Sequence, residues 1–155
     1  MIKLFTFFTL LVLGSATVFS QEVIKQQPCE NVSIRAQADS LKLIYVKKGF
    51  KVMKESTVSM ESEFEVPIIV QLRERSLYHF IFISDKTSRL FEVKMYDWEE
   101  KKIFSDKRKY EDGDGNISQW DHIPLTTNYH MIKPVQVNKK NKKMCGYFIV
   151  LKKVR

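Results

Sequence analysis

The chain has 155 residues, enough for one domain with a single core, and 44% of them are hydrophobic, which is ordinary for a globular protein. Its 26 lysines and arginines outnumber its 18 acidic residues and give a formal net charge of +8. With only five glycines and two cysteines, the chain has neither a glycine-rich phosphate-binding loop nor the cysteine spacing of a metal site.

The first 20 residues follow the order of a secretory signal peptide. Lys3 gives a positive start, residues 4–13 are apolar, and small residues precede the polar Gln21. The apolar run is about half of the roughly 20 residues that a membrane span requires. We therefore expect cleavage between Ser20 and Gln21, or after Ala16, rather than a retained anchor. Cleavage removes Lys3 and leaves a net charge of +7. The mature protein is expected to be extracytoplasmic, either periplasmic or secreted, without a transmembrane segment.

Cys29 and Cys145 stand near the two ends of the expected mature chain. In an oxidising compartment such an isolated pair is expected to form a disulfide. Closing so long a loop would stabilise the fold by about 4 to 5 kcal/mol in the chain-entropy model. Two independent buried thiols are the alternative.

A polar lead-in over residues 21–32 precedes the first expected element, a short helix over residues 33–48. The apolar side chains of this segment include pairs three and four residues apart. Asn31 or Ser33 can cap the start of the helix, and lysines followed by Gly49 suit its end. A strand over the letters LKLIYV is the alternative.

The chain after the helix predicts antiparallel strands. Residues 50–60 alternate weakly between polar and apolar side chains, and residues 63–72 alternate strictly. Residues 77–83 are apolar almost throughout, which indicates a central strand covered on both faces. Residues 90–97 alternate again, and we interpret the three runs within 63–98 as a β-meander.

Further strands are expected over residues 101–108 and 144–154, with a loop at 109–116. Between them, residues 117–125 lead through Pro124 toward the stretch 129–132, and residues 135–137 end in the lysine run. Strands spaced by about eight to twelve residues are typical of an antiparallel sandwich. The sequence therefore predicts a mainly β fold, a sandwich of seven or eight strands with one short N-terminal helix, in a single domain over residues 33–155.

The stretch 112–116, DGDGN, places acidic oxygens on alternate residues, as the opening of a calcium loop does. An EF-hand has glycine at its sixth position and glutamate at its twelfth, where this chain has Ile117 and Ile123. The pattern favours a hairpin turn with glycines at positive φ. An irregular calcium loop is the alternative.

Catalytic patterns are weak. The three histidines, His79, His122 and His130, form no HExxH motif or close sequence pair, and no serine lies in a G-x-S-x-G elbow. We expect no cofactor and no enzymatic activity. The rival hypothesis is a secreted hydrolase in which His122, His130 and Asp121 converge in space.

The densest basic run is predicted to be a solvated hairpin tip and consists of Lys139, Lys140, Lys142 and Lys143. It would make a larger patch for an anionic glycan or lipid if it were joined by Lys101, Lys102, Lys107, Arg108 and Lys109. Export makes nucleic acid an unexpected partner for this charge.

Three aromatic side chains, Trp98, Tyr110 and Trp120, fall at or near predicted turns. Exposed aromatic rings at such positions can stack on sugars or anchor a protein partner. Core packing is expected for at least one of the two tryptophans.

The succession EVPIIVQL, LYHFIFIS, FEVKMYDW and MCGYFIVLKK resembles the strand plan of small exported bacterial β-sandwich modules of the pre-peptidase C-terminal and GOLD-like types. In those modules a Tyr-x-Phe strand, here residues 78–80, precedes a strand ending in an aromatic residue and Asp, here Tyr96 and Asp97. The resemblance covers roughly residues 60–154, and the chain departs from it in lacking glycine-rich turns and carrying an extra N-terminal segment. It implies a non-catalytic binding or accessory role, and it transfers no site residue. The leader and the positive charge make the cell envelope the expected location and an envelope protein or an anionic glycan or lipid the expected partner.

Overall fold

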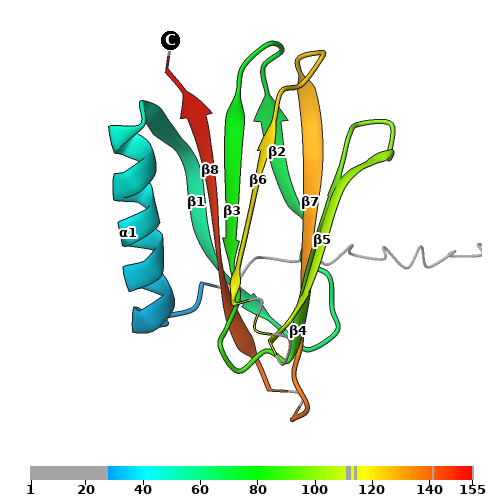
Figure 1. Cartoon of the computed structure of the whole chain (residues 1–155). Coiled ribbons are helices and arrows are strands. Elements are labelled where there is room, and N and C mark those ends of the chain that lie inside the picture. Colours follow the sequence, from blue (N-terminus) through cyan, green and yellow to red (C-terminus); the bar gives the residue numbers. More distant parts are fainter. Residues whose placement is uncertain (1–27, 111–112, 114, 141, 155) are drawn as a thin grey trace, which may run out of the picture.

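The computed structural model describes residues 28–110, 113, 115–140 and 142–154, and it shows one helix packed on a sandwich of two sheets (Figure 1). The cleavage site predicted at Ser20 and Gln21 lies outside the described residues. The predicted fold class is confirmed. The elements are α1 (Val32–Lys47), β1 (Phe50–Met60), β2 (Ile68–Leu72), β3 (Tyr78–Ile83), β4 (Leu90–Tyr96), β5 (Lys102–Lys109), β6 (Ile117–His122), β7 (Asn128–Val137) and β8 (Met144–Lys153).

The two sheets have the strand orders β1-β8-β3-β6 and β2-β7-β4-β5, and every neighbouring pair is antiparallel. The predicted meander over residues 63–98 is wrong, because β2 and β4 lie in one sheet and β3 lies in the other. Alternation shows which face of a strand is buried, but it does not show to which sheet the strand belongs. Sheets in a sandwich lie about 10 Å apart, so the loop of residues 73–77 is long enough to cross between them.

The loops after β5 and β7 also cross from one sheet to the other, so neither is the hairpin tip that the sequence predicts. Gly113 and Gly115 do have the predicted positive φ, at 75° and 71°. Asp112 and Asp114 lie outside the described residues. The alternative of a calcium loop therefore stays a prediction.

Large apolar side chains fill the space between the sheets. β3 is buried along its whole length, as predicted, because Phe80 and Phe82 face the other sheet while Ile81 and Ile83 face α1. Close packing here also depends on Gly146 in β8, where an added Cβ would lie 3.0 Å from the Phe82 ring. The result is an apolar core bounded by both sheets.

α1 covers the outer face of the sheet that contains β1, β8 and β3 (Figure 1). Its apolar contact is small, with Ile34 and Ala38 as its two buried residues. The helix starts where the Asn31 side chain accepts a hydrogen bond from the Ile34 N–H, at 3.2 Å, and it is followed by Gly49 at φ 80°. The alternative of a strand over LKLIYV is therefore wrong. Within the described residues, no helix is long and apolar enough to cross a membrane.

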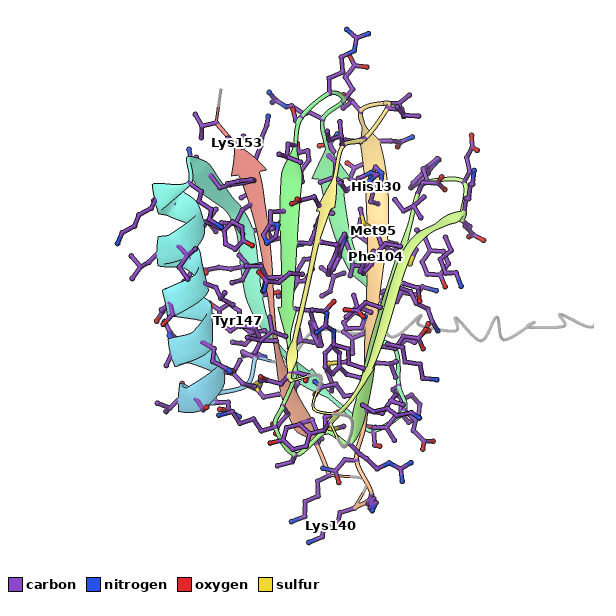
Figure 2. The ribbon with its side chains drawn as sticks, in the orientation of Figure 1. Met95, Phe104, His130, Lys140, Tyr147 and Lys153 are labelled. Atoms are coloured by element: carbon purple, nitrogen blue, oxygen red, sulfur yellow. A yellow bond between two sulfur atoms is a disulfide. The ribbon has the colours of Figure 1, made fainter. Side chains whose placement is uncertain are left out.

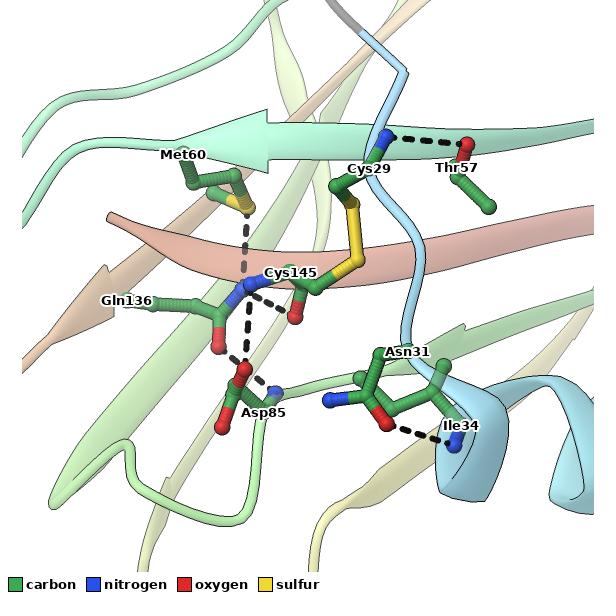
Figure 3. Close-up of a disulfide and its surroundings, with 8 residues drawn as sticks. All are labelled: Cys29, Asn31, Ile34, Thr57, Met60, Asp85, Gln136 and Cys145. Atoms are coloured by element: carbon green, nitrogen blue, oxygen red, sulfur yellow. Dashed lines mark hydrogen bonds between the residues drawn. A yellow bond between two sulfur atoms is a disulfide. The ribbon is translucent and has the colours of Figure 1, made fainter.

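A disulfide between Cys29 and Cys145 fastens the segment before α1 to β8, with 5.8 Å between the two Cα atoms (Figure 3). The predicted pairing is confirmed. Cys29 also donates its backbone N–H to the Thr57 hydroxyl in β1. The start of the helix is thus held by a covalent bond as well as by packing.

Candidate functional site

A basic cavity lies at the end of the sandwich where the β3–β4 loop (residues 84–89) meets the β7–β8 loop (residues 138–143). Its volume is about 670 Å³, within the usual range for ligand-binding pockets. Asp85 is the one carboxylate among the described residues that line it. We call this cavity the lysine basin, and its six cationic side chains are Lys86, Arg89, Lys139, Lys140, Lys142 and Lys143.

Hydrogen bonds of Asp85 hold the first loop of the basin in shape. One carboxylate oxygen accepts bonds from the backbone N–H and the hydroxyl of Thr87, both at 2.9 Å. The other oxygen accepts the Cys145 N–H at 3.1 Å, and the Asp85 N–H donates to the Gln136 side-chain oxygen at 2.8 Å (Figure 3). The carboxylate is therefore engaged by its own loop and by β8, next to the disulfide.

Asn138, which is buried, ties the second loop to the first. Its side-chain amide donates to the carbonyl and the hydroxyl oxygen of Thr87, at 3.2 and 3.3 Å. Its side-chain oxygen accepts the Lys140 N–H at 2.8 Å, and its own N–H donates to the Ser62 hydroxyl at 2.9 Å. These bonds fix the backbone of the β7–β8 loop at the rim of the basin.

The cations of the basin are exposed and lie close to one another. Within the described residues, no ion pair involves Lys86, Arg89, Lys140, Lys142 or Lys143. Cationic side chains gathered around one cavity raise the local concentration of anions. A bound anion would also relieve the repulsion among them.

The larger basic patch predicted from the sequence forms only in part. Lys109 pairs with Leu90 and lies at the basin end of β5, but Lys102 pairs with Tyr96 at the far end of the same strand. Eight extended residues span about 27 Å, so the prediction is wrong for Lys102 and for the preceding Lys101. Arg108 contacts Asp106 at 2.8 Å.

Lys86 and Arg89 take part in the basin although the sequence reasoning missed them. They flank a turn directly after the buried strand β3. Because they follow the apolar run of residues 77–83, the sequence alone could place them in a loop. Their proximity to the lysine run depends on the meeting of two loops that cross between the sheets.

The three candidate aromatic residues are separated in the structure. Tyr110 is exposed and lines the basin, whereas Trp98 is exposed in the β4–β5 turn, 6.0 Å from Tyr129 between ring centroids. Trp120 is only 7% exposed and belongs to the core. Its ring stacks between Phe80 and Phe104. The prediction that Trp120 binds a ligand at the surface is therefore wrong, and the prediction that at least one tryptophan packs in the core is confirmed.

The histidines of the hydrolase hypothesis meet, but without the aspartate. The rings of His122 and His130 lie 5.2 Å apart between centroids, and burial lowers the pKa of both. The Nε2 atom of His122 is buried without a hydrogen-bond partner among the described residues. Asp121 points to the opposite face of β6, because neighbouring side chains in a strand alternate.

Asp121 instead contacts His79, with 2.6 Å between the carboxylate oxygen and Nδ1. His79 is buried beneath the stacked ring of Tyr45 from α1, at 3.9 Å between centroids. This histidine therefore helps to seat the helix. Among the described residues, no three histidine, cysteine, aspartate or glutamate side chains gather to hold a metal ion.

No protein-family model matches the chain, and no curated protein matches its sequence. The resemblance to pre-peptidase C-terminal and GOLD-like modules therefore stays a prediction. Among the described residues, the lysine basin offers the clearest chemistry for a ligand.

Proposed function

We propose that this protein is an extracytoplasmic, non-catalytic binding protein that holds an anionic polysaccharide in the lysine basin. The observation that carries the proposal is the gathering of six cationic side chains around one cavity of about 670 Å³. The Cys29–Cys145 disulfide supports the compartment, because disulfides persist mainly outside the reducing cytosol.

The lining of the basin favours a glycan over a lipid. None of the described residues that line it is alanine, valine, leucine, isoleucine or methionine, so an acyl chain would meet only the stems of charged side chains and the Tyr110 ring. The exposed ring of Tyr110 offers a surface on which a sugar ring can stack. The side-chain NH₂ group of Asn31, whose oxygen caps α1, can donate to a sugar hydroxyl.

The proposal is tested by titrating the protein with dextran sulfate and with neutral dextran, using calorimetry at several salt concentrations. We expect binding to dextran sulfate alone, with an affinity that falls as salt screens the charges. The variant K139Q/K140Q/K142Q/K143Q should bind at least tenfold more weakly. Equal binding of both dextrans, or insensitivity to the lysine changes, would contradict the proposal.

A matched control removes the same amount of charge at the opposite end of the molecule. The variant K47Q/K51Q/R73Q/R75Q changes four exposed cationic residues outside the basin. It should weaken binding to dextran sulfate far less than the variant of the four basin lysines does. If both quadruple variants lose the same affinity, overall charge rather than the basin is responsible, and the proposal is wrong.

A further inference from the structure

The end of the sandwich opposite the lysine basin has a different surface. There the β2–β3 and β6–β7 loops, the α1–β1 turn and the end of β8 come together (Figure 1), and Figure 2 places Lys153 at this end and Lys140 at the other. A cavity of about 880 Å³ opens between these segments. We call this end the apical surface. Its cavity is lined by the carboxylate of Glu74 and by five cations, Lys51, Arg73, Arg75, Lys152 and Lys153.

In contrast to the lysine basin, this end carries exposed apolar side chains, with Met53 and Val154 in the lining of the cavity and Ile123 and Leu125 in the β6–β7 loop beside it. Leu125, in the β6–β7 loop, is 90% exposed. Ile123 in the same loop, Met53 in β1 and Val154 after β8 are each more than half exposed. Leaving such side chains in water is unfavourable, and exposed apolar groups of this kind mark surfaces that meet a partner.

Backbone hydrogen bonds hold the apical segments together. The Arg75 N–H donates to the Pro124 carbonyl at 3.0 Å, and the Glu74 N–H donates to the Thr127 hydroxyl at 3.0 Å. The Lys153 N–H donates to the Leu77 carbonyl at 2.9 Å. The loops therefore present arginines and leucine side by side in a fixed arrangement, which lowers the entropic cost of binding.

We propose that the apical surface docks on an anionic lipid bilayer. In this arrangement Leu125 and Ile123 enter the boundary between headgroups and acyl chains, while Lys51, Arg73 and Arg75 meet lipid phosphates. The combination of exposed aliphatic side chains with cations is what interfacial binding to anionic membranes requires. A polyanionic glycan would use the cations alone and leave the aliphatic side chains in water.

The acidic groups near this end are outnumbered by cations. Asp97, Glu99 and Glu100 belong to the β4–β5 turn, and Asp97 and Glu99 line a second cleft together with Trp98, Lys101 and Leu125. Glu74 is the one carboxylate among the described residues that line the apical cavity. Along the two clefts together, six cations (Lys51, Arg73, Arg75, Lys101, Lys152 and Lys153) face three carboxylates (Glu74, Asp97 and Glu99), so positive charge exceeds negative charge at the proposed lipid contact.

Docking through the apical surface leaves the lysine basin facing away from the bilayer, because the two lie at opposite ends of the sandwich (Figure 2). One molecule can then meet a membrane and a polysaccharide at the same time. The lipid proposal stands on its own observations and does not depend on the ligand of the basin.

The experiment is co-sedimentation of the protein with vesicles of pure phosphatidylcholine and of phosphatidylcholine with 30% phosphatidylglycerol, an anionic lipid. We expect binding to the anionic vesicles and at least tenfold weaker binding to the neutral ones. The variant K47Q/K51Q/R73Q/R75Q should lose at least tenfold of the affinity for anionic vesicles. The variant K139Q/K140Q/K142Q/K143Q should keep its vesicle binding, which separates this proposal from the basin.

Substitutions of Leu125 test insertion rather than charge. Because this side chain is 90% exposed, Leu125→Ser should leave the fold intact while weakening vesicle binding several-fold. Leu125→Trp should retain binding, since tryptophan favours the membrane interface. Val32→Ser, at a position 86% exposed at the start of α1, is the matched control and should change nothing. Absence of binding to anionic vesicles, or Leu125→Ser binding as tightly as the unmodified chain, would overturn the proposal.

Discussion

The two faces of the sheet β1-β8-β3-β6 are covered in different ways. One face packs on the second sheet through a core rich in large apolar side chains, among them Phe80, Phe82 and Phe148. The other face packs on α1, in which Ile34 and Ala38 are buried and Leu41 and Tyr45 are half-buried. The first interface therefore rests mainly on apolar burial, whereas the second combines a smaller apolar contact with other links.

Those links are polar and covalent. Around the helix, Gln37 bonds to Asn116, Tyr45 bonds to Gln119, and Lys42 bonds to Glu55. Most of these contacts are exposed, and such pairs contribute little individually. The disulfide next to the helix start is therefore expected to matter more for α1 than for the sandwich.

The largest expected effect is on the face between the sheets. Phe148→Ala removes a fully buried ring from β8 and should lower the free energy of unfolding by about 3 to 5 kcal/mol. Urea unfolding followed by fluorescence measures this change. Phe148→Leu should cost less, because it leaves a smaller cavity. A loss of under about 1 kcal/mol for Phe148→Ala would contradict the assignment of this face as the main core.

Reduction of the Cys29–Cys145 disulfide is expected to act mainly on the helix face. The bond spans 116 residues in sequence, and removal of a native disulfide typically costs about 2 to 4 kcal/mol. Hydrogen exchange should show faster exchange in α1 than in β4 after reduction, whereas Phe148→Ala should affect both. Equal acceleration in both elements would show that the two faces are not held independently.

A smaller and more local effect is expected at the helix cap. Asn31→Ala removes the side chain that accepts the Ile34 N–H and should cost about 1 kcal/mol. Asn31→Asp keeps an acceptor at this position and should preserve stability. Thermal unfolding monitored by circular dichroism compares the two variants, and equal melting temperatures would contradict a role for the cap.

The strands and the helix were largely predictable because their signals are local. The predicted strand over residues 50–60 coincides with β1, and the continuous apolar run of residues 77–83 gives the doubly covered β3. The alternation of polar and apolar residues does not show which sheet a strand joins. The prediction of a β-meander was wrong because it placed three consecutive strands in one sheet. The same limit applies to the lysine basin. The lysine run can be seen in the sequence, but the approach of Lys86 and Arg89 to it depends on loops that cross between the sheets.

Trp120 shows a second limit of the sequence. It lies near a predicted turn, and nothing local distinguishes it from the exposed Trp98. Its burial comes from Phe80 and Phe104, which belong to different strands and face it from both sides. Such contacts between distant segments decide which aromatic residues remain available to a ligand.

The smallest expected effect is the pH dependence of stability, and it arises on the face between the two sheets. The interior between the sheets ends near the β6–β7 loop in the pair His122 and His130, whose pKa values burial lowers below the ordinary 6.5. Asp97 and the Asn128 carbonyl partly offset this for His130. Between the lowered pKa values of the folded state and the ordinary histidine pKa, the folded state therefore binds fewer protons than the unfolded chain.

Stability from this pair is fully present above about pH 6.5, the ordinary histidine pKa, and is lost as pH falls through the lowered folded values. We expect a lower urea midpoint at pH 5.5 than at pH 7.5, by less than the helix-cap effect. His122→Gln, which removes one titrating ring and its unpartnered Nε2, should reduce this difference. Asn31→Ala should lower the midpoint at both pH values alike. A pH dependence that is unchanged in His122→Gln would mean that other groups set it, and that the histidine pair is not the titrating part of this interface.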